Sequence, residues 1–264
     1  MSAETKNLDT TGIRQLNLST SSGNITVVAE DRPDILIESG APDHDKIDRG
    51  KPWGPKGAIF GDHPHHKDGE PAAADGEIHF HSAKKGTANL VVRCPTGFDM
   101  VIGTASGDVH LLGEYGQVRV TTASGRVEVE TADQLDLRSI SGSLLVDTCK
   151  TGCRLQTVSG RTELRSGEHI EASTVSGKIQ MEETRGHVKV RSVSGNVELA
   201  TDGSGGLAIQ TVSGNVRIGV PEGSKPNANL MSLASRPKSE CPEGNDFELK
   251  VKSMSGKIEV VPRG

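Results

Sequence analysis

A short motif recurs along this chain at nearly constant spacing, and this internal repeat constrains the fold more than any other sequence feature. The motif is the dipeptide Ser-Gly. Its glycines are Gly23, Gly107, Gly125, Gly142, Gly160, Gly177, Gly195, Gly214 and Gly256. From Gly107 to Gly214 the steps are 18, 17, 18, 17, 18 and 19 residues. A unit this short cannot enclose a core alone, so successive units must stack on one another.

The residues around each of these glycines follow one template, numbered with the glycine as zero. Position −3 is Thr or Ser from Gly107 onward, and position −2 is apolar, as in Thr174 and Val175. Positions −7 and −5 before the glycine, and +2 and +4 after it, are mostly apolar. This period of two predicts two short strands per unit, with the glycine at the corner between them. We expect the side chains at −7, −5, −2, +2 and +4 to fill one interior.

Stacked units of this kind predict an all-β fold, namely a single-stranded parallel β-helix, or β-solenoid, with coils of about 17–19 residues. Eight or more coils at about 4.8 Å each give a rod of about 40–50 Å. Charges at position −6 support the stacking, because their sign alternates from coil to coil and neighbouring charges then attract. These residues are Arg119, Asp136, Arg154, Glu171 and Lys189.

Two segments interrupt the repeat within what we expect to be one solenoid domain over residues 1–264. The first, about residues 40–76, is rich in Pro, Gly and His and predicts a flexible insertion. The second spans about residues 221–246. Strand patterns precede and follow both segments, so we expect an N-terminal coil from residue 12 and an ordered core over about residues 77–261.

Composition excludes several classes of protein. The net charge is −5 and only 2% of the residues are aromatic, so the chain lacks the basic field and stacking surfaces of nucleic-acid binders. No apolar run of 18 residues predicts a membrane span, and the first 20 residues hold no secretory signal. We therefore expect a cytoplasmic protein, or an envelope-associated one if a native leader precedes this sequence.

The first insertion holds the candidate metal ligands. His63, His65 and His66 lie close together, with Asp62 and Asp68 on either side. Neutral imidazoles and carboxylates can bind a divalent metal, although ligands in a loop without a scaffold more often stay solvated. We expect no cofactor, and these three histidines are the candidate if a metal is bound.

Cys94, Cys149, Cys153 and Cys241 are too few and too scattered for a disulfide framework. Cys153 falls in the inward −7 column and Cys149 at a corner between strands. The pattern favours buried thiols without chemistry, and leaves redox or metal use of the Cys149–Cys153 pair as the alternative.

Outward glutamates at position +3 raise the alternative of a carbohydrate-active or metal-dependent enzyme. Glu128 and Glu163 are two coils apart, about 9–10 Å at the coil spacing, which an inverting hydrolase tolerates. Each follows a basic residue two positions earlier, Arg126 or Arg161, so both glutamates are expected to be part of a solvated charged face.

The unit Thr211-Val212-Ser213-Gly214-Asn215-Val216-Arg217-Ile218 resembles the repeat of a bacterial putative-adhesin β-strand-repeat family of unknown function. The steps Cys94-Pro95-Thr96-Gly97 and Val220-Pro221-Glu222-Gly223 are similar to that family as well. The resemblance implies a right-handed parallel β-helix and supplies no catalytic residues. The coil length also resembles that of bactofilins, which polymerise end to end.

These observations predict a non-enzymatic scaffold or adhesin-like interaction protein, whose partner is another protein or a second copy. The terminal strand, Lys257–Val261, is expected to be the last of the rod, with an unpaired edge open to a second copy. Ile258 and Val260 are the residues expected to mediate such self-association, unless residues 221–246 fold back over the end.

Overall fold

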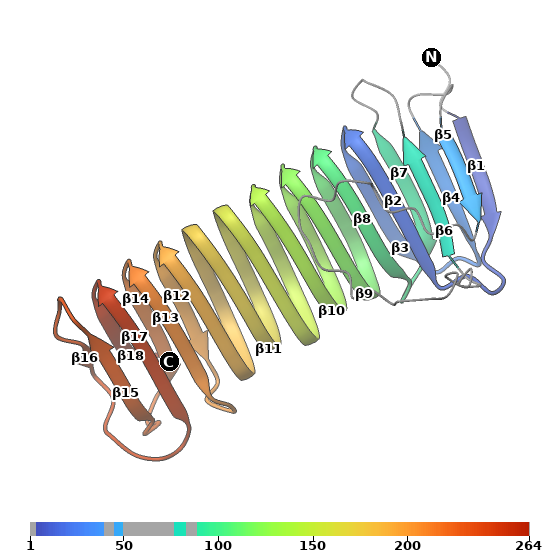
Figure 1. Ribbon diagram of the computed structural model, residues 1–264. Helices are drawn as coiled ribbons and strands as arrows, with labels where there is room; N and C mark the ends of the chain where they lie inside the picture. The colour runs from blue at the N-terminus through green and yellow to red at the C-terminus, as the bar shows by residue number, and fades with distance from the viewer. Residues whose placement is uncertain (1–3, 40–44, 50–76, 83–88, 264) are drawn as a thin grey trace, which may run out of the picture.

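The computed structural model describes residues 4–39, 45–49, 77–82 and 89–263, which form strands and turns without a helix. The strands stack into an elongated rod (Figure 1). Each coil of the rod contributes one strand segment before its Ser-Gly corner and one after it. We call the outer surface of the first set of segments face 1 and that of the second set face 2. The predicted all-β solenoid is therefore confirmed.

The central coils run without a break in their stacking. Their strands are β8 (Asp99–Ser106), β9 (Val109–Ser124), β10 (Val127–Ser141), β11 (Leu144–Ser194), β12 (Val197–Thr201), β13 (Leu207–Ser213) and β14 (Val216–Pro221). Strands β9, β10 and β11 continue from face 2 of one coil into face 1 of the next. Pairing is parallel and in the repeat register: Leu137 lies opposite Val120 on one side and Leu155 on the other.

The core is a column of inward side chains from both faces. Positions −7, −5, +2 and +4 are buried as predicted, for example Val188, Val190, Val197 and Leu199 at 0–2% exposure. Position −3 is buried too. The Thr and Ser residues of this column are 1–8% exposed from Thr104 to Ser253.

The prediction that position −2 points inward is wrong. Val175, for example, is 47% exposed, whereas its neighbour Thr174 is buried. Successive side chains of a strand point to opposite faces, so −7, −5 and −3 share the interior and −2 must point out. The buried hydroxyl finds a local partner at several corners: Thr122 Oγ1 donates to the Ser124 carbonyl at 2.9 Å. Thr157 and Thr211 form the equivalent bond, whereas the buried hydroxyl oxygens of Thr104, Ser139, Thr174, Ser192 and Ser253 have no hydrogen-bond partner within the described part of the chain.

At the N-terminal end the spatial order of coils departs from the chain order. The strands are β1 (Glu4–Asp9), β2 (Gln15–Ser22), β3 (Ile25–Glu30), β4 (Asp34–Ser39), β5 (Asp45–Arg49), β6 (Glu77–Ser82) and β7 (Leu90–Pro95). The β2/β3 coil lies between β8/β9 and the later coil β6/β7. Antiparallel strands then cover this end, β5 on β6 and β4 on β7, with β1 on β4.

The first predicted insertion thus contains strand β5, and the remainder of residues 40–76 lies outside the described residues. Face 1 and face 2 both end in an antiparallel strand on this side of the rod (Figure 1). A parallel coil therefore does not form the last layer at the N-terminal end.

At the C-terminal end the coil order is exchanged in the same way. The strands are β15 (Asn227–Ser232), β16 (Lys238–Ser239), β17 (Glu248–Ser255) and β18 (Ile258–Arg263). The β17/β18 coil pairs with β13/β14 on one side and with β15/β16 on the other, all in parallel. Residues 221–246 are therefore the outer layer here, as the alternative in the sequence analysis supposed.

Candidate functional site: an exposed apolar ridge

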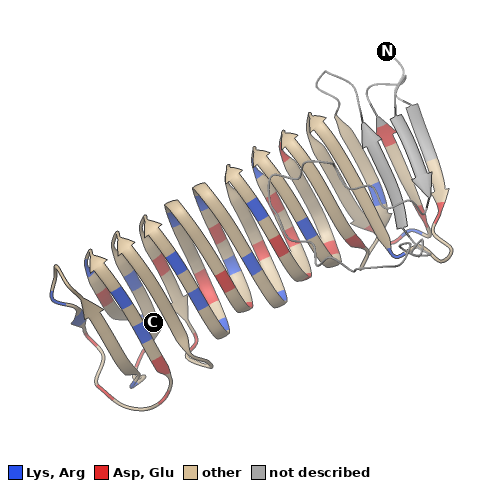
Figure 2. Ribbon diagram, viewed as in Figure 1, with Lys and Arg blue, Asp and Glu red and all other residues tan. Residues whose placement is uncertain are grey.

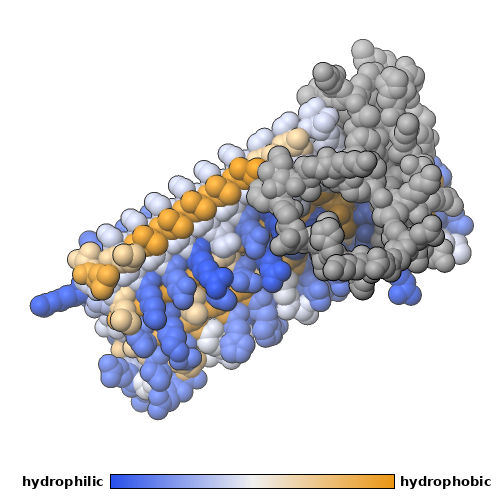
Figure 3. Space-filling model, in the orientation of Figure 1, coloured by the Kyte–Doolittle hydropathy of each residue, from blue (hydrophilic) through white to orange (hydrophobic). Residues whose placement is uncertain are grey.

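An unbroken row of apolar side chains runs along one edge of the rod, formed by the −2 positions. We call it the ridge: Ala105, Ala123, Ile140, Val158, Val175, Val193, Val212, Met254 and Leu233. The four valines are 41–48% exposed, Met254 is 56% exposed and Leu233 is 79% exposed. Figure 3 shows the ridge as an orange line along the edge where the arrowheads of β8, β13 and β17 lie in Figure 1.

Leu233 extends the ridge beyond the repeat itself. Ser232 lies opposite Ser253 in the register of β15 and β17, and the Leu233 N–H donates to the Ser253 carbonyl at 3.3 Å. Leu233 follows the end of β15 directly and Met254 is the equivalent residue of β17, so Leu233 occupies a −2 place in the outermost coil. We call each of the nine side chains of the ridge a rung. Neighbouring rungs are about 4.8 Å apart, so the ridge is about 38 Å long.

Basic residues flank the ridge on both sides. On face 1, position −4 carries the bases Arg138, Arg191 and Lys252. None of the −4 residues from Gly103 to Lys252 is acidic. Beyond the Ser-Gly corner, position +1 carries Arg126, Arg161, Lys178 and Lys257. Asp108 is the one acid in these two columns, and its Oδ1 accepts the Arg126 N–H at 2.8 Å. The columns next to the ridge therefore hold seven bases and one acid.

Carboxylates stand one column farther out and pair with these bases. On face 1, Asp136 Oδ1 is 3.1 Å from Arg138 Nε, and Glu171 Oε1 is 3.7 Å from Arg191 Nη1. The predicted alternation at −6 is confirmed as well, since Arg119 contacts Asp136 at 3.6 Å. Figure 2 shows these charges along the rod. Across this edge the order is therefore apolar, then basic, and then, on face 1, a column in which bases and acids alternate.

Face 2 carries a shallow hollow of about 430 Å³ across the coils from Leu112 to Gln180. Leu112 is exposed at its rim, and Glu128 and Glu163 line it. Both glutamates are paired as predicted: Glu163 Oε1 lies 2.8 Å from Arg161 Nε, and Glu128 Oε1 lies 3.4 Å from Arg126 Nη1. Glu128 also meets His110 Nδ1 at 2.8 Å. Both glutamates are therefore part of the charged outer surface of face 2.

The candidate metal ligands His63, His65 and His66 lie outside the described residues. Among the residues that the structure describes, no group of three His, Cys, Asp or Glu side chains has a metal-binding arrangement. The metal hypothesis therefore stays a prediction about the insertion.

The residues expected to mediate self-association lie in the core. Ile258 is 1% exposed and Val260 0% exposed, because both point into the interior of the last coil of the chain. Strand β16 also pairs with Glu259 and Val260, so β18 is not the outermost strand that the sequence analysis took it to be. Self-association itself stays a prediction, and the edge available for it belongs to β15 and β16.

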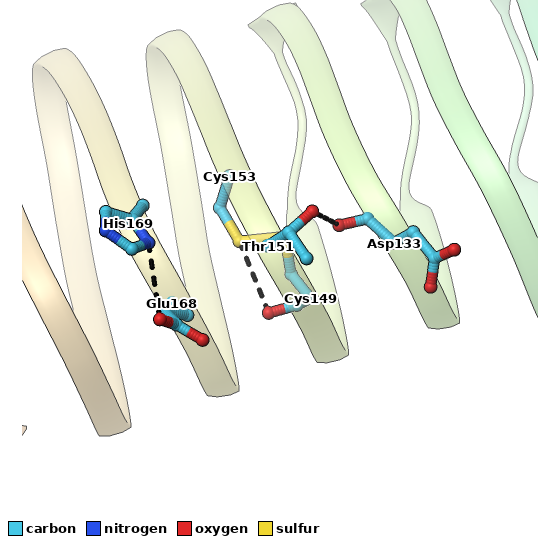
Figure 4. The surroundings of a disulfide bond; sticks show 6 residues. All are labelled: Asp133, Cys149, Thr151, Cys153, Glu168 and His169. Atoms are coloured by element: carbon cyan, nitrogen blue, oxygen red, sulfur yellow. Dashed lines mark hydrogen bonds and ion pairs between the residues drawn. A yellow bond between two sulfur atoms is a disulfide. The ribbon is translucent and has the colours of Figure 1, made fainter.

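Cys149 and Cys153 form a disulfide, with Cα atoms 6.2 Å apart (Figure 4). Both residues are buried, which the sequence pattern indicated for Cys153, but their pairing was not predicted. Next to them, Thr151 Oγ1 donates to the Asp133 carbonyl at 2.7 Å. This bond links the bend between face 2 and face 1 to the preceding coil. Disulfides persist mainly in oxidising compartments and are rare in cytosolic proteins, so a bond of this kind is more typical of a location outside the cytoplasm.

The two remaining thiols differ in environment. Cys94 is fully buried, and desolvation raises its pKa to about 12. Cys241 is half-buried in the outer segment at the C-terminal end, and desolvation also raises its pKa. Since the thiolate is the reactive form, burial protects Cys94 from thiol reagents more strongly than Cys241.

A thiol titration tests both statements. Without reductant we expect native protein to expose one reactive thiol, Cys241, and unfolded protein to expose two. After reduction in denaturant the count should rise to four. A count of four in unreduced, unfolded protein purified under acid quench from its native cells would show that the disulfide is not formed there. A chromogenic thiol reagent provides the measurement, and Cys241→Ser is the control for the native signal.

A family model described as Toastrack DUF4097 matches residues 7–261, nearly the whole chain. The chain belongs to this family. The Toastrack match covers both exchanged ends as well as the regular coils. It confirms the β-solenoid-like repeat domain of unknown function that the sequence resembled.

Two solved structures are similar to the Toastrack chain. One is a putative cell adhesion protein from Clostridium sporogenes, 10% identical, with a TM-score of 0.30 and 99% of each chain covered. The other is a putative adhesin from Bacteroides fragilis, 11% identical, with a TM-score of 0.39, covering 98% of this chain and 97% of that one. None of the curated proteins matches this sequence. The described part of the chain has no helix long and apolar enough to cross a membrane.

Proposed function

We propose that this Toastrack chain is a non-enzymatic interaction scaffold that binds its partner through the ridge. The observation that carries the proposal is the exposure of that row. A folded chain normally leaves single apolar residues exposed, and a contiguous apolar surface marks a site of interaction. Here the apolar residues recur at the same place in every central coil, although position −2 contributes nothing to the core.

The competing function is a carbohydrate-active or metal-dependent enzyme that uses the His-rich insertion. The ion pairs of Glu128 with Arg126 and of Glu163 with Arg161 favour the scaffold, because such pairs are typical of a solvated charged surface. The few aromatic residues of the chain also favour it, since sugar rings are usually bound by stacking on aromatic side chains. The enzyme hypothesis requires metal on purified protein, and that metal should disappear when residues 41–76 are deleted.

Self-assembly of the rod forms part of this proposal. The outer edges of β15 and β16 have no strand partner among the described residues, and such edges can pair with another chain. End-to-end contact would then use Asn227–Ser232 rather than the strand that contains Val260. Leu230→Pro removes a backbone donor from β15. Light scattering of this variant and of the intact chain compares their masses in solution.

A matched pair of variants tests the role of the ridge. The triple variant Val158→Thr, Val175→Thr and Val193→Thr keeps the β-branched shape but makes three rungs polar. Leu112→Ser changes a similarly exposed apolar residue on face 2 and serves as the control. Wild type and each variant would be immobilised and exposed to soluble and membrane fractions of the native organism, and any bound partner purified and rebound.

We expect at least one partner that is retained by wild type and by Leu112→Ser and lost from the triple variant. A partner that all three chains retain equally would contradict the proposal, as would the absence of any partner. Thermal unfolding of the three chains ensures that the comparison is between folded proteins.

A further inference from the structure

We propose that the ridge and its two basic columns form an edge that lies on an anionic lipid bilayer surface. This inference rests on the proposed function and names the partner of the ridge. The side chains at −2 would enter the boundary between headgroups and acyl chains, and the Arg and Lys side chains on both sides would contact anionic headgroups.

The shape of the ridge favours a flat partner over a globular one. Its side chains lie near the Ser-Gly corners, where the chain turns from face 1 to face 2, so the row projects along an edge (Figure 3). A protein partner would need a straight groove about 38 Å long to cover all nine rungs. A bilayer surface is wide and deformable, and it can cover a straight projecting edge at any length.

The charge beside the ridge selects an anionic partner. Arg138 and Lys252 stand two residues before their rungs, and Arg161 and Lys178 stand three residues after theirs, so bases line both sides. Two copies placed ridge on ridge would bring these like charges together, which opposes a second copy as the occupant. The phosphates of a nucleic acid would suit the bases, but an apolar row between them has nothing to contact there, and aromatic stacking residues are scarce.

The C-terminal end of the ridge is the part best suited to enter lipid. Met254 and Leu233 are more exposed than the four valines, and their side chains are longer than those of the valines. Lys252 and Lys257 stand on either side of Met254, and neither forms an ion pair within the described part of the chain. Long basic side chains can extend along an apolar surface while their charge remains among headgroups. Apolar area and unpaired positive charge therefore coincide at this end.

Sedimentation with vesicles tests the inference on the full chain. One set of vesicles contains phosphatidylcholine alone, and the other contains phosphatidylcholine with about one-third phosphatidylglycerol. We expect binding to the anionic vesicles, little binding to the neutral ones, and a strong decrease at high salt because exposed charges are screened. The ridge triple variant at 158, 175 and 193 should bind at least about tenfold more weakly.

A second variant separates charge from apolar area. Lys252→Gln with Lys257→Gln should weaken partitioning by at least about tenfold, since each base near an anionic surface contributes about a fivefold change. Lys150→Gln with Arg165→Gln removes the same net charge away from the ridge and should bind nearly as wild type. Leu112→Ser is the matched control for the triple variant. Circular dichroism of each chain confirms that it remains folded.

Several outcomes would overturn the lipid assignment: no binding of wild type to anionic vesicles, equal binding to neutral ones, or ridge variants that bind as their controls do. If vesicle binding fails while a soluble protein is captured in a ridge-dependent way, the scaffold proposal stands and its partner is that protein. If neither lipid nor protein depends on the ridge, both proposals fail.

Discussion

Replacing Gly160 by alanine is expected to destabilise the rod by about 3–5 kcal/mol, or to prevent folding. Gly160 stands at a Ser-Gly corner with φ of 143°, a conformation that side chains rarely adopt. A Cβ atom added there would fall far inside van der Waals contact of the Gly142 carbonyl oxygen in the preceding coil. That oxygen belongs to backbone and cannot move aside, and the same close approach recurs at Gly177, Gly195 and Gly214.

Gly152→Ala is the matched control, because a Cβ atom at Gly152 meets nothing within 4 Å and its φ is not positive. We expect this change to alter the free energy of unfolding by less than about 1 kcal/mol. Urea denaturation followed by circular dichroism measures both variants. Equal midpoints for Gly160→Ala and Gly152→Ala would show that the glycines do not stack as the structure has them.

The second large effect separates two valines of β11. Val190 at position −5 is fully buried, whereas Val175 at position −2 is 47% exposed. Val190→Asp places a carboxylate without a partner in the core and should cost about 3–5 kcal/mol. Val175→Asp should change the free energy of unfolding by only about 0.5 kcal/mol, because its side chain remains in water.

Thermal or urea unfolding of the two aspartate variants beside wild type provides the measurement. The comparison distinguishes two orientations of position −2. In the structure Val175 points outward, whereas the sequence pattern was interpreted as placing it in the interior. A severe loss of stability in Val175→Asp, comparable with that of Val190→Asp, would restore the earlier assignment and remove the ridge.

The local organisation of the rod could be predicted from the sequence because the same residue pattern occurs in each coil. Each coil repeats the alternation that forms its strands, and the Ser-Gly corner marks where they meet. The pairing of Asp136 with Arg119 followed from stacking, and that of Glu163 with Arg161 followed from their spacing of two residues on one face of a strand. Such features depend on residues close in sequence or one coil apart, so one unit informs the next.

The inward assignment of position −2 failed because hydrophobicity was given more weight than strand parity. Thr174 and Val175 are adjacent, and only one of them can share the interior with Ala172 and Ile170. The signal was present: positions −7 and −5 are both odd, which selects −3. Had parity been applied, the apolar row would have been recognised as an exposed surface and the candidate site found from sequence.

The exchanged coils at the two ends carried no comparable signal. Which of two layers lies outside depends on pairings between distant segments, such as β15 with β17, rather than on the pattern within either strand. The Cys149–Cys153 bond is similar, because it depends on how the corner between faces brings two side chains together. These features arise from tertiary arrangement, which one sequence does not specify by periodicity.

Because the coil order is exchanged only at the two ends, the number of central coils can change without altering either end layer. The coils around Gly125, Gly142 and Gly160 stack only on other regular coils. Duplication or loss of one such unit in the gene would therefore lengthen or shorten the rod by about 4.8 Å while both end layers keep their partners. Each added unit would also bring one more apolar rung and its neighbouring charges. Selection could in this way tune the reach and the strength of attachment together, by a single recombination event.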